Sequence, residues 1–169
     1  IGEGFDCQKL SADYILTEVS GLPYGNTSQM LEGGGNPYVG MLYAMNNRYG
    51  WGVYNADRIY RVWDAFGIQQ AQMLGYWHSR CPIHTDNSEV FVTVYQKPDA
   101  LLAVAYNFSE KAQSFHYEID LEKLPFRPGR KETVRLYAKE WRKIERAANL
   151  SGENTLPKRD GVMFLLHKA

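Results

Sequence analysis

The sequence predicts two unlike pieces in one chain of 169 residues: an α/β segment with parallel strands, followed by an antiparallel β-sandwich. Two observations support this division. Residues 1–69 hold 11 of the 15 glycines, together with continuous apolar runs typical of strands buried on both faces. Residues 70–169 hold short runs in which apolar and polar residues alternate between turn-forming segments. We therefore expect a domain boundary near residue 70, with one unit over 1–69 and another over 70–169.

The first unit is expected to run strand, loop, short helix, strand, loop, helix. Ile1–Phe5 resembles the end of a buried strand, and Tyr14–Ser20 and Val39–Met45 are nearly continuous apolar runs that predict two more. Between them, Thr27 or Ser28 is expected to cap a short helix through Leu31, which the glycines at 33–35 then end.

The clearest helix of the sequence is expected over residues 56–66. Asn55 has the side chain of an N-cap, and Gly67 follows the last helical position. Four apolar side chains fall on one helical stripe: Ile59, Val62, Trp63 and Phe66. This stripe predicts a helix that buries one face and exposes Asp57 and Asp64 on the other.

The second unit is expected to consist of short antiparallel strands. Val90–Gln96 alternates, so that three valines share one face and Phe91, Thr93 and Tyr95 the other. Further strands are expected at Leu101–Phe108, Phe115–Ile119, Thr133–Ala138 and Val162–His167. The basic stretch Lys139–Asn149 is expected to form a surface helix or an irregular crossing.

Composition and charge exclude several classes of protein. Apolar residues make up 44% and charged residues 22%, which is ordinary globular usage. The 19 basic and 19 acidic side chains give zero net charge, which argues against nucleic acid or an anionic membrane as the main partner. No apolar run approaches the roughly 18 residues of a membrane span. The balance is uneven, with four basic and seven acidic side chains in 1–69 but 15 and 12 in 70–169.

A metal site is considered at His78, Cys81 and His84, with Asp86 beyond them. These residue types bind zinc, but their spacing matches no closed structural set, so a linker with incidental polar side chains is the favoured interpretation. The sequence also lacks a phosphate-binding glycine loop and a serine-nucleophile elbow. We therefore expect no metal and no cofactor.

Two features depend on the compartment of the protein. Cys7 and Cys81 lie far apart, and whether they pair is left open, because a disulfide needs an oxidising compartment. Three asparagines, which matter only where the source glycosylates, stand in N-x-Ser sequons: Asn26, Asn107 and Asn149. Ile1 is not an initiator Met, and the chain is expected to be a fragment or a processed piece.

Carboxylates near expected strand ends are the candidate catalytic groups. Glu3 stands at the end of the first strand and Glu18 near the end of the second, and parallel strands bring their carboxyl ends to one edge of a sheet. Two such carboxylates would lie about 5–10 Å apart, the separation used in glycosidic hydrolysis. The alternatives are that Glu18 forms a structural pair with Arg48 or backbone amides, and that Glu3 anchors a loop. Asp6 and Glu32 are expected near the substrate.

Aromatic residues concentrate between positions 38 and 54. Tyr38, Tyr43, Tyr49, Trp51 and Tyr54 are interleaved with Asn46, Asn47 and Arg48. Aromatic faces beside amide and guanidinium donors suit sugar rings, whose C–H faces stack while their hydroxyls form hydrogen bonds. We expect Trp51, Asn47 and Arg48 to contact a saccharide. The alternative is that these aromatic side chains pack against the neighbouring unit.

Several segments resemble the end of a bacterial glycoside-hydrolase-like family. They are residues 1–6, 18–25, 40–48 and 63–68, followed by Gly75-Tyr76-Trp77 and Thr85-Asp86-Asn87. The resemblance covers most of the chain up to about Asn107. It implies that the chain holds the last strands and the last helix, 56–66, of a (β/α)8 TIM-type barrel, and then a C-terminal sandwich. It also implies a carbohydrate substrate and a periplasmic or secreted location.

The leading hypothesis is therefore the C-terminal part of a glycoside hydrolase that is inactive alone, because all eight loops build the pocket of a barrel. The alternative is a non-catalytic carbohydrate-binding or structural module, in which Tyr137 and Trp141 are the main exposed aromatic residues of the sandwich.

Overall fold

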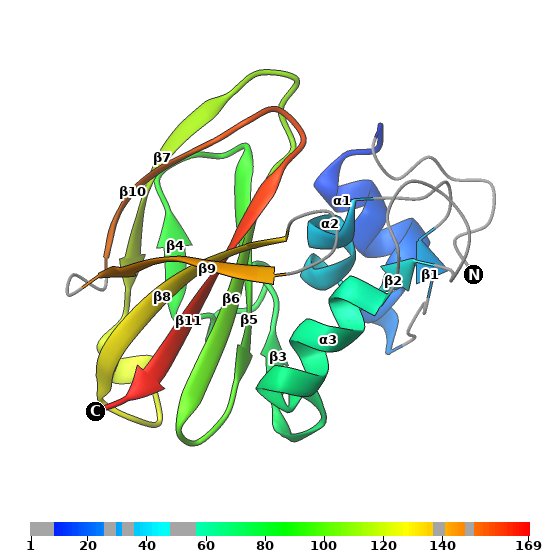
Figure 1. Cartoon of the computed structure of the whole chain (residues 1–169). Coiled ribbons are helices and arrows are strands. Elements are labelled where there is room, and N and C mark those ends of the chain that lie inside the picture. The colour runs from blue at the N-terminus through cyan, green and yellow to red at the C-terminus, as the bar shows by residue number, and fades with distance from the viewer. Residues whose placement is uncertain (1–8, 26–29, 32–35, 48–56, 137–140, 148–150) are drawn as a thin grey trace.

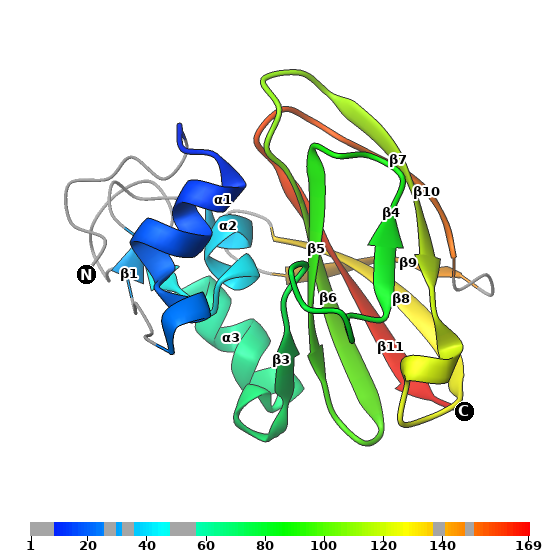
Figure 2. The same ribbon diagram turned by 180° about the vertical axis from the view of Figure 1, so that it is seen from behind.

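A computed structural model shows a layer of short helices packed on one face of a β-sandwich (Figures 1 and 2). The structure describes residues 9–25, 30–31, 36–47, 57–136, 141–147 and 151–169. The sandwich consists of one six-stranded and one three-stranded sheet, and every strand pairing within them is antiparallel. The expectation of antiparallel sheets in the second half of the chain is confirmed.

The larger sheet has the strand order β3-β5-β6-β11-β8-β9, and the smaller sheet has the order β10-β7-β4. In chain order the strands are β3 (Gln72–Leu74), β4 (Ile83–Thr85), β5 (Val90–Gln96), β6 (Ala100–Asn107), β7 (Gln113–Ile119), β8 (Pro128–Leu136), β9 (Trp141–Ala147), β10 (Gly152–Leu156) and β11 (Gly161–Lys168). A short helical turn, η4 (Leu121–Lys123), follows β7. The expected helix or crossing over Lys139–Asn149 is wrong for 141–147, because this segment is strand β9, paired with β8.

Both faces of the six-stranded sheet are covered. Val92 and Val94 of β5 face the smaller sheet, whereas Thr93 and Tyr95 face the helices, as the alternation of the sequence predicts. β6 lies between β5 and β11 and is buried along its whole length. A strand that is covered on both faces needs apolar residues at every position, which explains the continuous apolar run of β6.

The helical layer contains α1 (Ala12–Tyr14), which continues into the π-helical η1 (Ile15–Ser20), then η2 (Leu22–Tyr24), α2 (Pro37–Leu42), α3 (Asp57–Phe66) and η3 (Ile68–Gln70). One parallel pair, β1 (Met30–Leu31) with β2 (Asn46–Asn47), accompanies them. Leu31 therefore belongs to a strand and not to the expected short helix. Thr27 and Ser28, the expected caps of that helix, lie outside the described residues.

The two buried strands expected over 14–20 and 39–45 are wrong, since both segments are mainly helical. In the first, Ser11 caps the helix by accepting a hydrogen bond from the Tyr14 amide, and the buried side chains recur every three to four residues. In the second, Asn36 caps α2 and Pro37 occupies its first turn. α2 is buried on all sides, and a short apolar run of that kind does not distinguish a helix from a strand.

The helix expected over 56–66 is confirmed as α3. Val62 and Phe66 are buried and Asp64 is exposed, as the apolar stripe predicts. Gly67 ends the helix with φ 74°, and its amide donates to the carbonyl oxygens of Trp63 and Asp64. Left-handed backbone at this position favours glycine, so the helix ends where the sequence places its stop signal.

Hydrogen bonds to the sandwich fix α2 at both ends. The Thr93 hydroxyl donates to the Leu42 carbonyl at 3.0 Å, and the Tyr95 hydroxyl donates to the Met41 carbonyl at 2.6 Å. At the other end, the Asn36 side chain donates to the Arg159 carbonyl at 3.1 Å. The last carbonyls of a helix lack partners within the helix, so these bonds satisfy buried groups that would otherwise cost free energy. Buried side chains of the helical layer and of the facing side of the six-stranded sheet also pack into one cluster, which is separate from the core between the two sheets.

Candidate functional site

Most of the expected site residues lie outside the described part of the chain. These are Glu3, Asp6, Glu32, Arg48 and Trp51. Asn47 belongs to β2, where only the backbone is described. Their assigned roles stay predictions.

Glu18 is described, and its position differs from the expected one. It lies on η1 with an exposed side chain, while its neighbours Val19 and Ser20 are buried. The interpretation of Glu18 as a carboxylate inside a buried strand is wrong, because the helical turn directs it to solvent. The cost of burying a charge therefore gives no argument for its function. Its catalytic role stays a prediction that only substitution tests.

Two of the aromatic residues considered for a sugar site belong to the core. Tyr38 is 4% exposed and Tyr43 is 1% exposed. The Tyr43 hydroxyl donates to the Ala12 carbonyl at 2.9 Å, and its ring stacks on Trp77 with centroids 6.0 Å apart. For these two residues the alternative interpretation, that the side chains pack in the interior, is confirmed. Tyr49, Trp51 and Tyr54 lie outside the described residues.

The His78, Cys81 and His84 side chains do not converge. The His78 ring accepts a hydrogen bond from the Arg80 amide, whereas the exposed His84 ring lies 3.5 Å from the Lys123 amine. The Cys81 thiol is free and buried, and it lies 3.6 Å from the Ile83 carbonyl oxygen. Among the described residues, no three His, Cys, Asp or Glu side chains are grouped as a metal ion would need. The interpretation of this segment as a linker is wrong, because Cys81 lies in the core of the sandwich and His84 belongs to strand β4. The expectation of no metal stays a prediction.

The Cys81 thiol is expected to be inert in the folded protein. Burial raises its pKa, so that less thiolate forms at a given pH, and the thiolate is the reactive species. In a Cys7→Ser variant at pH 8, we expect a thiol-specific aromatic disulfide reagent to react at least about 100-fold more slowly with the native chain than with the chain unfolded in guanidinium chloride. Equal rates in the two states would contradict the burial of this side chain.

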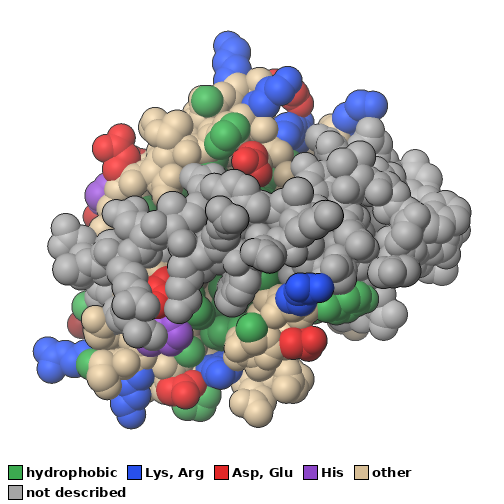
Figure 3. Space-filling model, in the orientation of Figure 1, with side chains coloured by type: hydrophobic (Ala, Val, Ile, Leu, Met, Phe, Trp, Pro, Cys, Tyr) green, Lys and Arg blue, Asp and Glu red, His purple; other side chains and the backbone are tan. Residues whose placement is uncertain are grey.

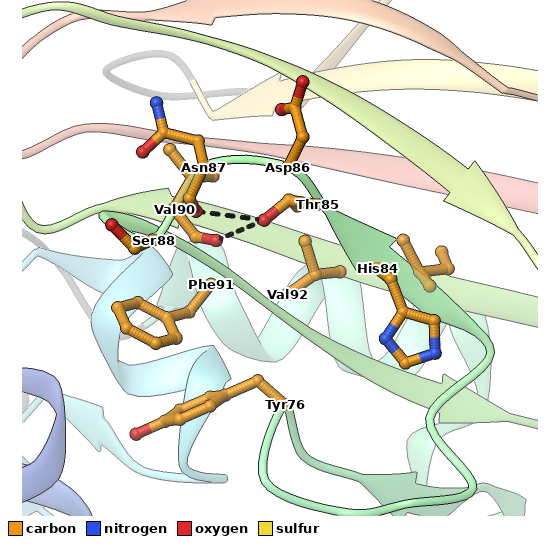
Figure 4. Close-up of a pocket in the computed structure, with 10 residues that line it drawn as sticks. Tyr76, His84, Thr85, Asp86, Asn87, Ser88, Val90, Phe91 and Val92 are labelled. Carbon is orange, nitrogen blue, oxygen red and sulfur yellow. Dashed lines mark hydrogen bonds between the residues drawn. The ribbon is translucent and has the colours of Figure 1, made fainter.

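A groove of about 400 Å³ opens between the loop that follows β3 and the turn that joins β4 to β5 (Figure 4). Its side chains are Tyr76, Ile83, His84, Thr85, Asp86, Asn87, Ser88, Val90, Phe91 and Val92. The rings of Tyr76 and Phe91 lie together, with centroids 4.6 Å apart. Burial raises the pKa of the Tyr76 hydroxyl to about 12, so this group remains protonated at neutral pH. Its oxygen lies 3.3 Å from the Tyr43 hydroxyl.

The turn Thr85–Val90 is held by its own side chains. The Thr85 hydroxyl donates to the carbonyl oxygens of Asn87 and Val90, the two dashed lines of Figure 4. Asp86 accepts a hydrogen bond from the His116 amide at 2.8 Å, and Asn87 donates to the Ser114 carbonyl at 3.0 Å. In Figure 4 Asp86 and Asn87 point away from the Tyr76 ring. These residues therefore make a fixed wall, and the segment Thr85-Asp86-Asn87 has a structural role.

A second groove, of about 370 Å³, adjoins the first, because Ser88 and Phe91 line both. Its remaining side chains are Lys9, Leu10, Ser11, Ala12, Asp13, Glu89, Phe108 and Arg159. They come from the start of α1, from the β4–β5 turn, from the residue that follows β6 and from the turn between β10 and β11. Sequence reasoning missed both grooves, because the residues that build them lie up to 150 positions apart and share no motif.

Charged side chains of both signs line the second groove. The second groove holds Asp13 and Glu89 as well as Lys9 and Arg159. On the face seen in Figure 3, coloured acidic and basic side chains are likewise interspersed. A surface of mixed sign beside aromatic rings suits a ligand rich in hydroxyl groups better than a polyanion.

Among the described residues, no helix is both long and apolar enough to cross a membrane. The sequon at Asn107 lies in the core, since its side chain is 0% exposed and donates to three carbonyl oxygens. A glycan cannot be attached there in the folded chain.

Comparison with known families identifies both halves of the chain. A search of curated proteins returned no match. Residues 1–50 match the family model "Glycoside hydrolase 123, TIM-barrel domain". Residues 55–167, more than half of the chain, match "Glycoside hydrolase 123, C-terminal domain", a region that takes in α3 and most of the sandwich. The two matches follow each other in the order that the resemblance of the sequence implies, and the chain belongs to the glycoside hydrolase 123 family.

Proposed function

We propose that the chain is the C-terminal part of an enzyme that hydrolyses glycosidic bonds in poly- or oligosaccharides. The observation that carries this proposal is the pair of consecutive matches to the barrel and C-terminal domains of one glycoside hydrolase family. In this proposal residues 1–69 contribute the end of the catalytic barrel and residues 70–169 form the C-terminal sandwich domain. The proposed boundary thus assigns α3 to the barrel, although the C-terminal match begins at residue 55.

The sandwich acts as a brace for the catalytic part. Its six-stranded sheet supplies Thr93 and Tyr95 to the end of α2, and Lys97 donates to the Phe66 carbonyl at the end of α3 at 3.0 Å. Active-site loops need a rigid support, because displacements of about 1 Å in a catalytic group cost about 100-fold in rate. A shared core supplies such support more firmly than a flexible linker would.

The chemistry is assigned to a pair of carboxylates, one as general acid and the other as nucleophile or general base. Glu3 and Glu18 are the proposed pair, and Asp6, Glu32, Asn47, Arg48 and Trp51 are the proposed substrate contacts. The exposed position of Glu18 on η1 is compatible with access by a substrate. No further carboxylate of this chain is required by the proposal.

Substitution of the two carboxylates tests the assignment. In a protein that carries this chain behind a complete barrel, Glu3→Gln and Glu18→Gln are each expected to lower kcat on a responsive aryl glycoside by about 100-fold or more, because acid/base catalysis contributes about 10²–10⁴. Initial rates on a panel of aryl glycosides measure this effect.

Asp64→Asn is the matched control, since Asp64 is exposed on α3 and has no proposed role. Unchanged turnover in either glutamine variant would remove that residue from the catalytic role. A complete barrel protein that hydrolyses no glycoside in the panel would leave the alternative, a non-catalytic carbohydrate-binding or structural module.

A further inference from the structure

We propose that the two adjoining grooves beside Phe91 form one binding site for a neutral oligosaccharide segment. The proposal rests on the proposed function in that it takes carbohydrate as the ligand class. It goes further by assigning a saccharide site to the sandwich and the start of α1, outside the carboxylates and aromatic residues considered in the catalytic part.

The two grooves share two lining residues, and each has the size of a small-ligand site. Ser88 and Phe91 line both, so a ligand that passes over these two residues occupies both grooves. Their volumes of about 400 and about 370 Å³ each fall within the roughly 300–1,000 Å³ typical of ligand pockets. Two adjoining spaces of similar size suit consecutive rings of a chain.

Aromatic side chains form the shared part of the site. Phe91 packs on Tyr76 with centroids 4.6 Å apart and on Phe108 with centroids 5.5 Å apart, so its ring is held from two sides. Phe91 and Tyr76 remain partly exposed. In Figure 4 the rings of Phe91, Tyr76 and His84 all lie on the same side of the β4–β5 turn. A fixed, partly exposed aromatic surface can stack against the C–H face of a sugar at low entropic cost.

Polar side chains at the rim can bind hydroxyl groups. Asp13, Ser88 and Glu89 are exposed and line the second groove together with Arg159. Carboxylates accept two hydrogen bonds side by side and guanidinium donates two, a geometry that matches neighbouring hydroxyls on a sugar ring. Because acidic and basic groups are both present, a neutral sugar chain is favoured over a phosphorylated or sulfated one.

Arg159 is the residue that most clearly points to a ligand. Its backbone has φ 50°, a left-handed conformation that is unfavourable for an ordinary residue and that glycine adopts freely. Its Nε donates to Glu110 at 2.8 Å, whereas its Nη1 atom is buried and has no hydrogen-bond partner within the described part of the chain. The Nη1 atom is closed to solvent, but the side chain as a whole is 20% exposed and lines the groove. A strained residue in the wall of a groove is typical of a functional position. The ligand would contact the exposed part of this side chain.

The variant Arg159→Gly is expected to weaken ligand binding without lowering the stability of the fold. Glycine fits the left-handed backbone, so this variant is expected to retain the thermal stability of the parent chain. Lys158→Gly is the matched control: it removes one positive charge from the same turn at an exposed residue that lines neither groove. A second control, Glu110→Gln, removes the partner of Arg159 and leaves the guanidinium in place.

The test is isothermal titration of the 169-residue chain with three neutral hexasaccharides: a β-1,4-glucan, a β-1,4-xylan and a β-1,4-N-acetylglucosamine oligomer. At least one is expected to bind, with an affinity that falls about tenfold or more in Arg159→Gly, a loss of about 1.4 kcal/mol, and about twofold or less in Lys158→Gly. Absence of binding by all three, or equal binding by parent and Arg159→Gly, overturns the proposal.

The outcome is independent of the test of catalysis. If the complete barrel protein loses turnover in its carboxylate variants while Arg159→Gly binds sugar normally, the proposed function stands and the groove proposal fails. If Arg159→Gly abolishes binding and the complete protein hydrolyses nothing, the groove proposal stands and the proposed function fails.

Discussion

Replacement of Asn107 with alanine is expected to lower the free energy of unfolding by about 3–5 kcal/mol. The buried Asn107 amide donates to the carbonyl oxygens of Lys111, Leu156 and Pro157, and its own oxygen accepts from the Ser109 amide at 2.8 Å. Alanine leaves these backbone groups without their partner, in a place where water does not replace it. Chemical denaturation followed by tryptophan fluorescence measures the effect.

Asn87→Ala is the matched control for this substitution. Asn87 also joins separate segments, since it donates to Gln113 and Ser114 and accepts from the Glu89 amide. It lies at the surface of a turn, where water can take over these bonds, so its loss is expected to cost about 1 kcal/mol. Equal costs at the two positions would contradict the conclusion that burial sets the energy of the Asn107 network.

The sandwich strands could be predicted because their sequence has a clear period. In β5, alternate residues face two different cores, and the bounds expected from the sequence, Val90–Gln96, are those of the structure. Strands β3, β4 and β10 could not be predicted in this way. They have three to five residues, which is too short for a period to be visible, and their pairing is set by neighbours distant in the chain.

The helical layer was mispredicted for a physical reason. Residues 14–20 and 39–45 are apolar on several sides because α2 and the start of η1 are enclosed by other elements. A polar face normally marks a helix, but enclosure removes it from α2 and limits it in η1 to Thr17 and Glu18. The informative signals were the caps, Ser11 before α1 and Asn36-Pro37 before α2, and these local signals are more specific than the apolar runs.

The candidate grooves could not be predicted from sequence because they are a product of tertiary structure. Asp13, Phe91 and Arg159 stand in three different segments, and only the packing of α1 against the sandwich brings them together. Arg159 occupies a left-handed turn position that usually holds glycine. That conformation is visible only in the structure.

Gly161→Ala is expected to destabilise the chain by about 3 kcal/mol or more, through a steric conflict between the two layers. A Cβ atom at this position would lie 2.4 Å from Cγ of Tyr38 and 2.7 Å from the carbonyl oxygen of Ala105. Tyr38 belongs to the buried α2, and Ala105 belongs to the neighbouring strand β6, so neither can withdraw without moving its whole element. The first residue of β11 must therefore lack a side chain if α2 is to lie against the sheet.

Two further variants identify the cause of this loss. Gly152→Ala, in β10, is expected to change stability by about 0.5 kcal/mol or less, because its nearest neighbour would be the Tyr117 hydroxyl at 3.6 Å. In a double-mutant cycle, Gly161→Ala combined with Tyr38→Ala is expected to cost less than the sum of the two single changes, since the smaller side chain removes part of the conflict. If the stability losses of the two single variants simply add, Tyr38 of α2 does not clash with a side chain at position 161 of β11. Coupling, together with one cooperative unfolding transition, would mean that the helical layer and the sandwich fold as one unit, as a brace for a catalytic barrel requires.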